Sequence, residues 1–157
     1  LYDFFSILAQ DLVIDSYQGS SKENEYGEEN GYAGYIKEAM AFIKNEYARG
    51  IGVRELADHL NITRSYLYTI FMNELNISPK DFLKKYRVTR ARELLSLTDL
   101  SVEAIGKSCG YGNSERFARV FKQENGLTPT QFRKSDRNRS RRNLEMSKTE
   151  LEQLMNS

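Results

Sequence analysis

An imperfect internal repeat constrains the fold of this chain more than any other feature. The only two prolines, Pro79 and Pro129, stand 50 residues apart, within the segments SPKDF from residue 78 and TPTQF from residue 128. A hydroxyl residue is a favourable helix N-cap, and proline fits the first helical position because its missing N–H has no helical partner there. Gln131 completes a capping box behind Thr128. Both segments are therefore predicted to begin helices.

The repeat extends upstream of both prolines. At an offset of 50 the matched pairs are Phe71 with Phe121, Ile70 with Val120 and Leu67 with Phe117. Further upstream the offset is 49, and the pairs are Val53 with Val102, Leu56 with Ile105, Ala57 with Gly106, Leu60 with Cys109 and Asn61 with Gly110. The second copy thus carries one extra residue in its turn. Two copies are too few for a solenoid, which needs about three, so a domain of two lobes is predicted.

Each copy has the pattern of a helix, a tight turn and a second helix. In the first copy a short helix over Val53–His59 is followed by Asn61, which tolerates a left-handed backbone, and by Thr63 as the cap of the next helix. In the second copy Ser101 caps, Gly110 makes the turn, and Asn113 or Ser114 caps again. Small residues, Ala57 and Gly106, stand where the two helices must approach closely. The combination indicates two helix-turn-helix units.

The flanking sequence gives the domain organisation. Residues 1–17 have a helical apolar stripe and are expected to end a preceding sensor or dimerisation region, whereas the Gly-, Ser- and Glu-rich residues 18–31 are expected to form a flexible linker. Residues 32–134 are helical in pattern throughout, with a helix closed by Gly50 and a long linker helix from Ser78 to about Leu97. Residues 135–157 form a basic and polar tail, expected to be a short helix or disordered. The predicted fold class is all-α.

The outward faces of the two second helices are candidates for contact with DNA bases. Leu67, Ile70 and Phe71 face inward in one helix, and Phe117, Val120 and Phe121 face inward in the other. The candidates for base contacts are Arg64, Ser65, Tyr68 and Thr69, then Ser114, Glu115, Ala118 and Arg119. Arg119 suits guanine, Glu115 suits cytosine, and Ala118, Thr69 and Tyr68 suit a thymine methyl group.

Candidates for phosphate contacts flank these faces. They are Thr63, Asn113, Arg116 and Lys122, with Lys84, Arg87 and Arg90 of the linker helix. Asp81 and Glu93 are alternative partners for the linker cations. The run from Arg137 to Arg142 either adds phosphate contacts or belongs to a solvated tail. A protein-interaction module built on the same helices is the alternative function.

Charge and composition limit the kinds of partner and the cellular location expected for this protein. The net charge of +1 combines −6 in residues 1–30 with +7 in the remainder. This distribution suits a polyanionic partner, and it equally suits a solvated surface with an acidic linker. There is no apolar run of about 18 residues for a membrane span and no secretory leader, so we expect a cytoplasmic protein. The chain begins at Leu1, and we expect it to be a fragment.

Catalytic chemistry has no support in the sequence. There is no His/Asp/Ser constellation, no Gly-rich phosphate loop and no metal-spaced cluster, so no enzyme, metal or cofactor is predicted. His59 is expected at the surface, and Cys109 is expected to be a small core residue.

The stretch from about Ile51 to Arg133 resembles the DNA-binding domain of AraC/XylS-type regulators. The resemblance rests on VRELADHLNITRSYLYTIF, and more specifically on SVEAIGKSCGYGNSERFARVFKQENGLTPTQFRK. It implies a bilobal domain of about seven helices, with homeodomain-like units, that binds double-stranded DNA and regulates promoters in bacteria, often through RNA polymerase. It also implies a missing N-terminal region for sensing, often of sugars, and for homodimerisation. Gly52 stands where the family often has a capping Ser or Thr, which predicts some fraying there.

Overall fold

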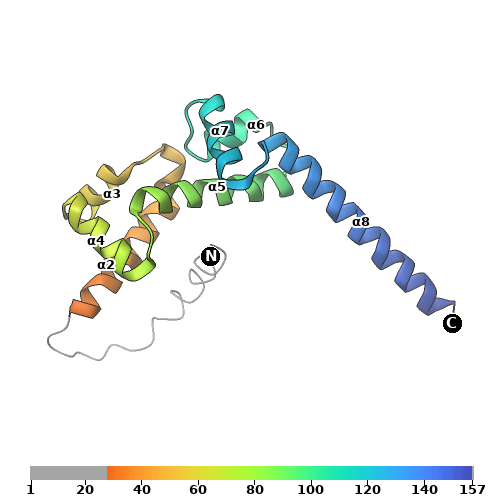
Figure 1. Cartoon of the computed structure of the whole chain (residues 1–157), viewed down its shortest axis with the longest axis horizontal. Coiled ribbons are helices and arrows are strands. Elements are labelled where there is room, and N and C mark those ends of the chain that lie inside the picture. The colour runs from red at the N-terminus through yellow and green to blue at the C-terminus, as the bar shows by residue number, and fades with distance from the viewer. Residues whose placement is uncertain (1–27, 157) are drawn as a thin grey trace. The chain divides into compact units, whose positions relative to one another are not determined.

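The computed structural model describes residues 28–156, and within them the chain forms seven α-helices and no strand (Figure 1). The predicted helix over 1–17 and the first ten residues of the predicted linker lie outside the described residues. The α-helices are α2 (Glu28–Glu46), α3 (Val53–His59), α4 (Arg64–Leu75), α5 (Pro79–Leu97), α6 (Val102–Ser108), α7 (Ser114–Asn125) and α8 (Pro129–Met155). A 3-10 turn, η1 (Tyr47–Arg49), follows α2. The prediction of an all-α fold is confirmed.

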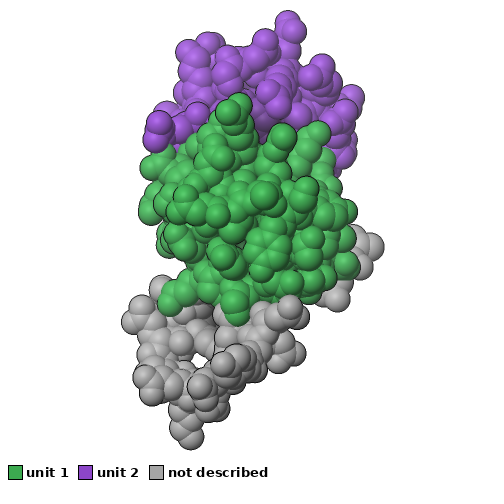
Figure 2. Space-filling model, turned by 90° about the vertical axis from the view of Figure 1, so that its left-hand side faces the viewer, with its two compact units in different colours: residues 1–47, 51–85 green, residues 48–50, 86–157 purple. Residues whose placement is uncertain are grey.

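The chain divides into two compact units, coloured separately in Figure 2. Within the described residues, unit 1 comprises residues 28–47 and 51–85, and unit 2 comprises residues 48–50 and 86–156. Each unit contains one copy of the repeat. The helix α5 contributes its first residues to unit 1 and the remainder to unit 2.

The core of unit 1 joins the helices α2, α3, α4 and the start of α5. Leu67, Ile70 and Phe71 of α4 have no exposed surface, as the apolar pattern predicts. The Phe71 ring meets the ring of Phe82 edge to face, with centroids 5.6 Å apart. The apolar stripe of α2 contributes the buried Ile36, Ala39 and Ile43. Burial of these side chains is the main stabilisation of helices that are too short to persist alone.

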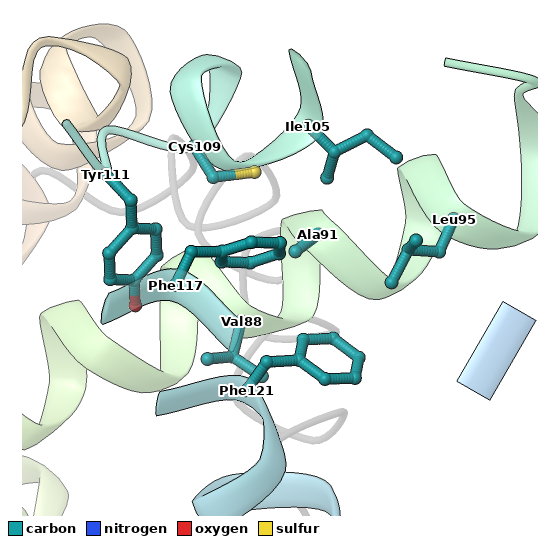
Figure 3. Close-up of a cluster of buried hydrophobic side chains, with 8 residues drawn as sticks. All are labelled: Val88, Ala91, Leu95, Ile105, Cys109, Tyr111, Phe117 and Phe121. Carbon is teal, nitrogen blue, oxygen red and sulfur yellow. The ribbon is translucent and has the colours of Figure 1, made fainter. Parts of the chain in front are cut away.

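The core of unit 2 is built around two phenylalanines of α7. Phe117 and Phe121 are fully buried, with ring centroids 5.8 Å apart. They pack with Tyr111 and with residues of α5 and of the α6 segment, namely Val88, Ala91, Leu95, Ile105 and Cys109 (Figure 3). The predicted burial of Cys109 is confirmed.

Two helices are longer than the sequence analysis predicts. Four residues assigned to the linker, 28–31, begin α2. The tail after Lys134 is neither a short helix nor disordered, because α8 continues unbroken to Met155 (Figure 1). No glycine or proline interrupts it after Pro129. Ion pairs one turn apart support it, Arg139 with Asp136 at 2.8 Å and Arg141 with Glu145 at 3.3 Å.

Candidate nucleic-acid interface

The turn of the first unit has the geometry that its sequence predicts. Asn61 has a φ of 54°, in the left-handed region. Its N–H donates to the carbonyl of Asp58 (3.2 Å), and the N–H of Ile62 donates to the carbonyl of Ala57 (3.1 Å). The hydroxyl of Thr63 then accepts from the N–H of Tyr66 (3.1 Å), which caps α4.

The turn of the second unit repeats these bonds 49 residues later. Gly110 has a φ of 89°, and its N–H donates to the carbonyl of Lys107 (3.1 Å). The N–H of Tyr111 donates to the carbonyl of Gly106 (2.9 Å). Asn113, not Ser114, caps α7, because its Oδ1 accepts from the N–H groups of Glu115 (2.8 Å) and Arg116 (3.0 Å). The extra residue in this turn is Gly112. Both helix-turn-helix units are therefore formed.

The backbone N–H at the start of α3 has a hydrogen-bond partner that the sequence analysis did not predict. Gly52 has no capping side chain, and some fraying was predicted there. Instead, the N–H of Gly52 donates to Oε2 of Glu55 (2.9 Å). Backbone hydrogen bonds from Glu55 itself and from Gly52 lower the pKa of this carboxyl. The sequence signal was an acid three residues after the cap, which is half of a capping box.

The outward face of α4 presents all four predicted base-contact residues. Arg64, Ser65, Tyr68 and Thr69 are exposed and line one shallow hollow of about 560 Å³. Tyr68 keeps 52% of its surface exposed. The hydroxyl of Thr69 donates to the carbonyl of Ser65 (3.2 Å), so its donor is already engaged within the helix.

The outward face of α7 is charged. Ser114, Glu115 and Arg119 are exposed, and Ala118 is half-buried. Arg116 and Lys122, predicted to contact phosphates, are also exposed. In residues 28–156 no ion pair joins Arg116, Arg119 or Lys122 to an acid. These cations would therefore attract a polyanion without first breaking an internal pair.

The cations of the linker helix α5 form more contacts within the protein than those of α7. Lys84 lies 3.5 Å from Asp81, and Arg90 bonds to Glu93 at 2.9 Å and to the hydroxyl of Tyr86 at 3.2 Å. This is the alternative pairing that the sequence left open. Arg87 is half-buried near Tyr111 and Cys109, and burial lowers its pKa. The phosphate role of these three residues remains a prediction.

His59 and Cys109, whose side chains could in principle act in catalysis, both lie in packing environments that do not favour it. His59 is exposed, stacks on Phe42 with centroids 4.1 Å apart, and places Nε2 3.5 Å from Glu38. Burial raises the pKa of the Cys109 thiol to about 11, so its nucleophilic thiolate is disfavoured. Across the described residues there is no cluster of three or more metal-binding side chains. None of the helices described is long and apolar enough to cross a membrane.

Comparison with known proteins identifies this pair of units. A family model described as a helix-turn-helix domain matches residues 56–135, which is just over half of the chain. A solved structure of a probable AraC family transcriptional regulator from Rhodopseudomonas palustris is 26% identical, covers 66% of this chain and 97% of that one, and has a TM-score of 0.55. The chain belongs to the AraC/XylS family.

Two further relatives agree with membership of the AraC/XylS family. The raffinose operon transcriptional regulatory protein RafR of Pediococcus pentosaceus is 37% identical over 62% of this chain and 35% of its own length. The C-terminal domain of AraT, a response regulator from Geobacillus stearothermophilus, is 29% identical over 64% of this chain and 84% of its own, with a TM-score of 0.62. The family is one of DNA-binding transcription regulators and not of enzymes. The chain spans between a quarter and a half of the length of the first curated relatives.

Proposed function

We propose that this chain is the promoter-binding part of a bacterial regulator of a carbohydrate operon, with α4 and α7 entering successive major grooves of one duplex. The observation that carries the proposal is the repeated turn geometry. The same backbone bonds recur 49 residues apart, and each turn leads into a capped helix whose outward side chains, except the half-buried Ala118, are exposed. The raffinose operon regulator among the relatives supports the carbohydrate assignment.

The chemistry of the two outward faces differs. On α7, the guanidinium of Arg119 suits a bidentate pair with O6 and N7 of guanine, and Glu115 suits N4 of cytosine. On α4, Thr69 and Tyr68 offer a methyl group and a ring, which suit thymine methyl groups. We expect α7 to supply the hydrogen-bonded part of the specificity, at about 1–3 kcal/mol for each good pair.

Phosphate contacts would fix the position of each helix on the duplex. Thr63 and Asn113 mark the N-terminal ends of α4 and α7, where backbone N–H groups and the helix dipole favour an anion. The linker helix α5 has 19 residues and is therefore about 28 Å long. We propose that, on a duplex, the two recognition helices bind one turn of DNA apart, about 34–36 Å.

Salt dependence tests DNA binding by this chain. Duplexes selected from a random pool should bind it, and the logarithm of the binding constant should fall linearly with the logarithm of salt concentration as counterions are released. Failure to bind any duplex at low salt would contradict the proposal and favour a protein-interaction module.

Replacement of one arginine tests the assignment of α7. Arg119→Ala should remove about 1–3 kcal/mol of discrimination at one base pair of the selected duplex, with a smaller loss on random DNA. Lys44→Ala, which removes an exposed cation from α2, is the matched control and should leave the discrimination unchanged. An equal loss on every sequence would make Arg119 a phosphate contact instead.

The remaining proposals concern the intact protein. We expect it to act in the bacterial cytoplasm, to bind a sugar and form a homodimer through its N-terminal region, and to contact RNA polymerase at the promoter. Sedimentation of the intact protein, with and without raffinose-type oligosaccharides, tests the dimer. A monomer under both conditions would contradict the dimerisation proposal.

A further inference from the structure

The end of the linker helix α5 has an unusual cap. The last four carbonyls of a helix lack partners within it, and a residue in the left-handed conformation commonly satisfies them. Positive φ angles in residues 28–156 occur only at Gly50, Asn61, Asn76, Gly110 and Gly126. Asn76 ends α4 and Gly126 ends α7 in this way, but no such residue follows α5.

Thr98 donates to the carbonyl of Leu94 from its N–H (3.0 Å) and its hydroxyl (2.6 Å), and a side chain from a distant helix completes the cap. Arg133 of α8 donates from Nε to the carbonyl of Leu95 (3.1 Å), and from Nη2 to the carbonyls of Leu100 (2.6 Å) and Thr98 (3.4 Å). Arg137, one turn later, donates to the carbonyl of Thr98 (3.3 Å) and to the carboxylate of Asp99 (2.5 Å). The Asp99 side chain is 95% exposed, and such pairs contribute little. The half-buried Arg133 is therefore the main connection.

These bonds connect both ends of the second helix-turn-helix unit to α5. Leu100 immediately precedes Ser101, whose hydroxyl caps α6 by accepting from the N–H of Ala104 (3.1 Å). At the other end, Phe132, next to Arg133, packs its ring 5.5 Å from that of Phe121 of α7. A reciprocal capping box between Thr128 and Gln131 fixes the start of α8. Arg133 thus closes a ring of contacts through α5, α6, α7 and α8.

The repeat shows that this arrangement is specific to unit 2. At the offset of 50, the residue matching Arg133 is Leu83, which is buried and apolar. At the offset of 49, Leu100 matches Ile51, and the turn before Ile51 has Gly50 at a φ of 74°. The first copy ends the helix before its helix-turn-helix unit with a local turn, whereas the second adds to the local bonds of Thr98 a side chain from beyond its recognition helix.

We propose that Arg133 is a positioning residue for base recognition by α7, acting by fixing the α5–α6 loop, residues 98–101, to the start of α8. This inference rests on the proposed DNA-binding function. Arginine suits the role because its planar guanidinium has several donors in a fixed geometry, whereas lysine has a single flexible ammonium group.

The test compares Arg133→Met with Lys134→Met, which removes the neighbouring exposed cation of α8. The probe is a duplex selected by the unmodified chain, with single base-pair changes in the half bound by α7 or in the half bound by α4. We expect Arg133→Met to reduce discrimination against changes in the α7 half at least ten-fold, and to leave discrimination in the α4 half unchanged. Lys134→Met should preserve both. A residue that only stabilises unit 2 would lower the folded fraction and weaken binding to every duplex equally.

Hydrogen exchange tests the contact without DNA. The amides of residues 98–104 should exchange at least ten-fold faster in Arg133→Met than in Lys134→Met, with α4 unaffected. Arg133→Lys, which retains one donor group, should give an intermediate rate and intermediate discrimination. Unchanged exchange would overturn the proposal, and so would unchanged discrimination in the α7 half. Unfolding of unit 2 in both Arg133 variants would also overturn it, because Arg133 would then be a folding residue. If the unmodified chain selects no duplex, the proposed function fails, and hydrogen exchange still decides whether Arg133 holds the loop.

Discussion

At the scale of single residues, the two copies of the repeat differ at two matching core positions, one in the first helix and one in the second helix of each unit. At matching positions of the repeat, unit 1 has the buried Ala57 and Leu67, whereas unit 2 has Gly106 and the larger Phe117. A Cβ on Gly106 would lie 2.9 Å from Cδ1 of Phe117, closer than such atoms pack. Gly106→Ala should therefore lower the free energy of unfolding by about 1–3 kcal/mol, measured by chemical denaturation.

The matched control for that substitution lies in the turn that follows α6. A Cβ on Gly112 would meet no atom within 4 Å, so Gly112→Ala should change the stability little. Adding Phe117→Leu to Gly106→Ala recreates the pair of unit 1 and should restore part of the loss. Equal stability of the Gly106→Ala and Gly112→Ala variants would show that the contact relaxes at no cost.

The buried thiol and phenol groups of unit 2 predict that the free energy of unfolding decreases at alkaline pH. Burial raises the pKa of the Cys109 thiol to about 11, and that of the Tyr111 hydroxyl is also raised. The unfolded chain loses the thiol proton at lower pH than the folded chain, so stability declines between about pH 9 and pH 11. The Cys109 contribution is at most about 3 kcal/mol. Cys109→Ala should flatten this decline in denaturation curves, and an identical decline would assign it to other groups.

Turn residues could be predicted because their conformation depends on their neighbours in sequence. Asn61 was assigned to a left-handed position and Gly110 to the turn, and both have positive φ. Gln131 was assigned to a capping box and forms one. Arg133 gave no such signal, because its partners lie 33 to 38 residues earlier and it resembles any other cation near a basic run.

At the scale of helices, Asn113 combines a cap with a position proposed to face phosphate. Its Oδ1 accepts two N–H groups at the start of α7. Asn113→Ala should therefore cost about 0.5–2 kcal/mol of stability. Asn113→Asp should keep the cap and the stability but weaken DNA binding at low salt, because it adds a negative charge near the phosphates. If Asn113→Asp binds DNA as well as the parent chain, this helix end does not contact phosphate.

Helix ends without a capping signal in the sequence were harder to predict than the existence of the helices. The bounds of α3 and the span of α5 were predicted almost to the residue, because apolar spacing and caps agree there. The continuation of α8 was missed, because a polar segment without an apolar core face has no periodic signal. Its stability depends on helix propensity and on pairs such as Arg141 with Glu145.

At the scale of the whole molecule, the distribution of charge decides how much α8 adds to DNA binding. Residues 139–157 carry four cations and three acids, a net charge of +1. Arg139 and Arg141 are paired with acids, and Arg142 donates to the carbonyl of Asn138. Arg133 and Arg137 are engaged with the α5–α6 loop. The basic run therefore offers fewer charges to phosphate than its sequence suggests.

Truncation after Asn138 tests that conclusion, because it removes the distal part of α8 but keeps Arg133 and Arg137. Each phosphate contact contributes about 0.9 to the slope of log binding constant against log salt. We expect the slope of the truncated chain to differ from that of the full chain by less than about 1. Arg116→Gln and Lys122→Gln, on the exposed flank of α7, should each reduce it by about 0.9. A reduction of two or more on truncation would mean that the distal arginines leave their acidic partners to bind phosphate.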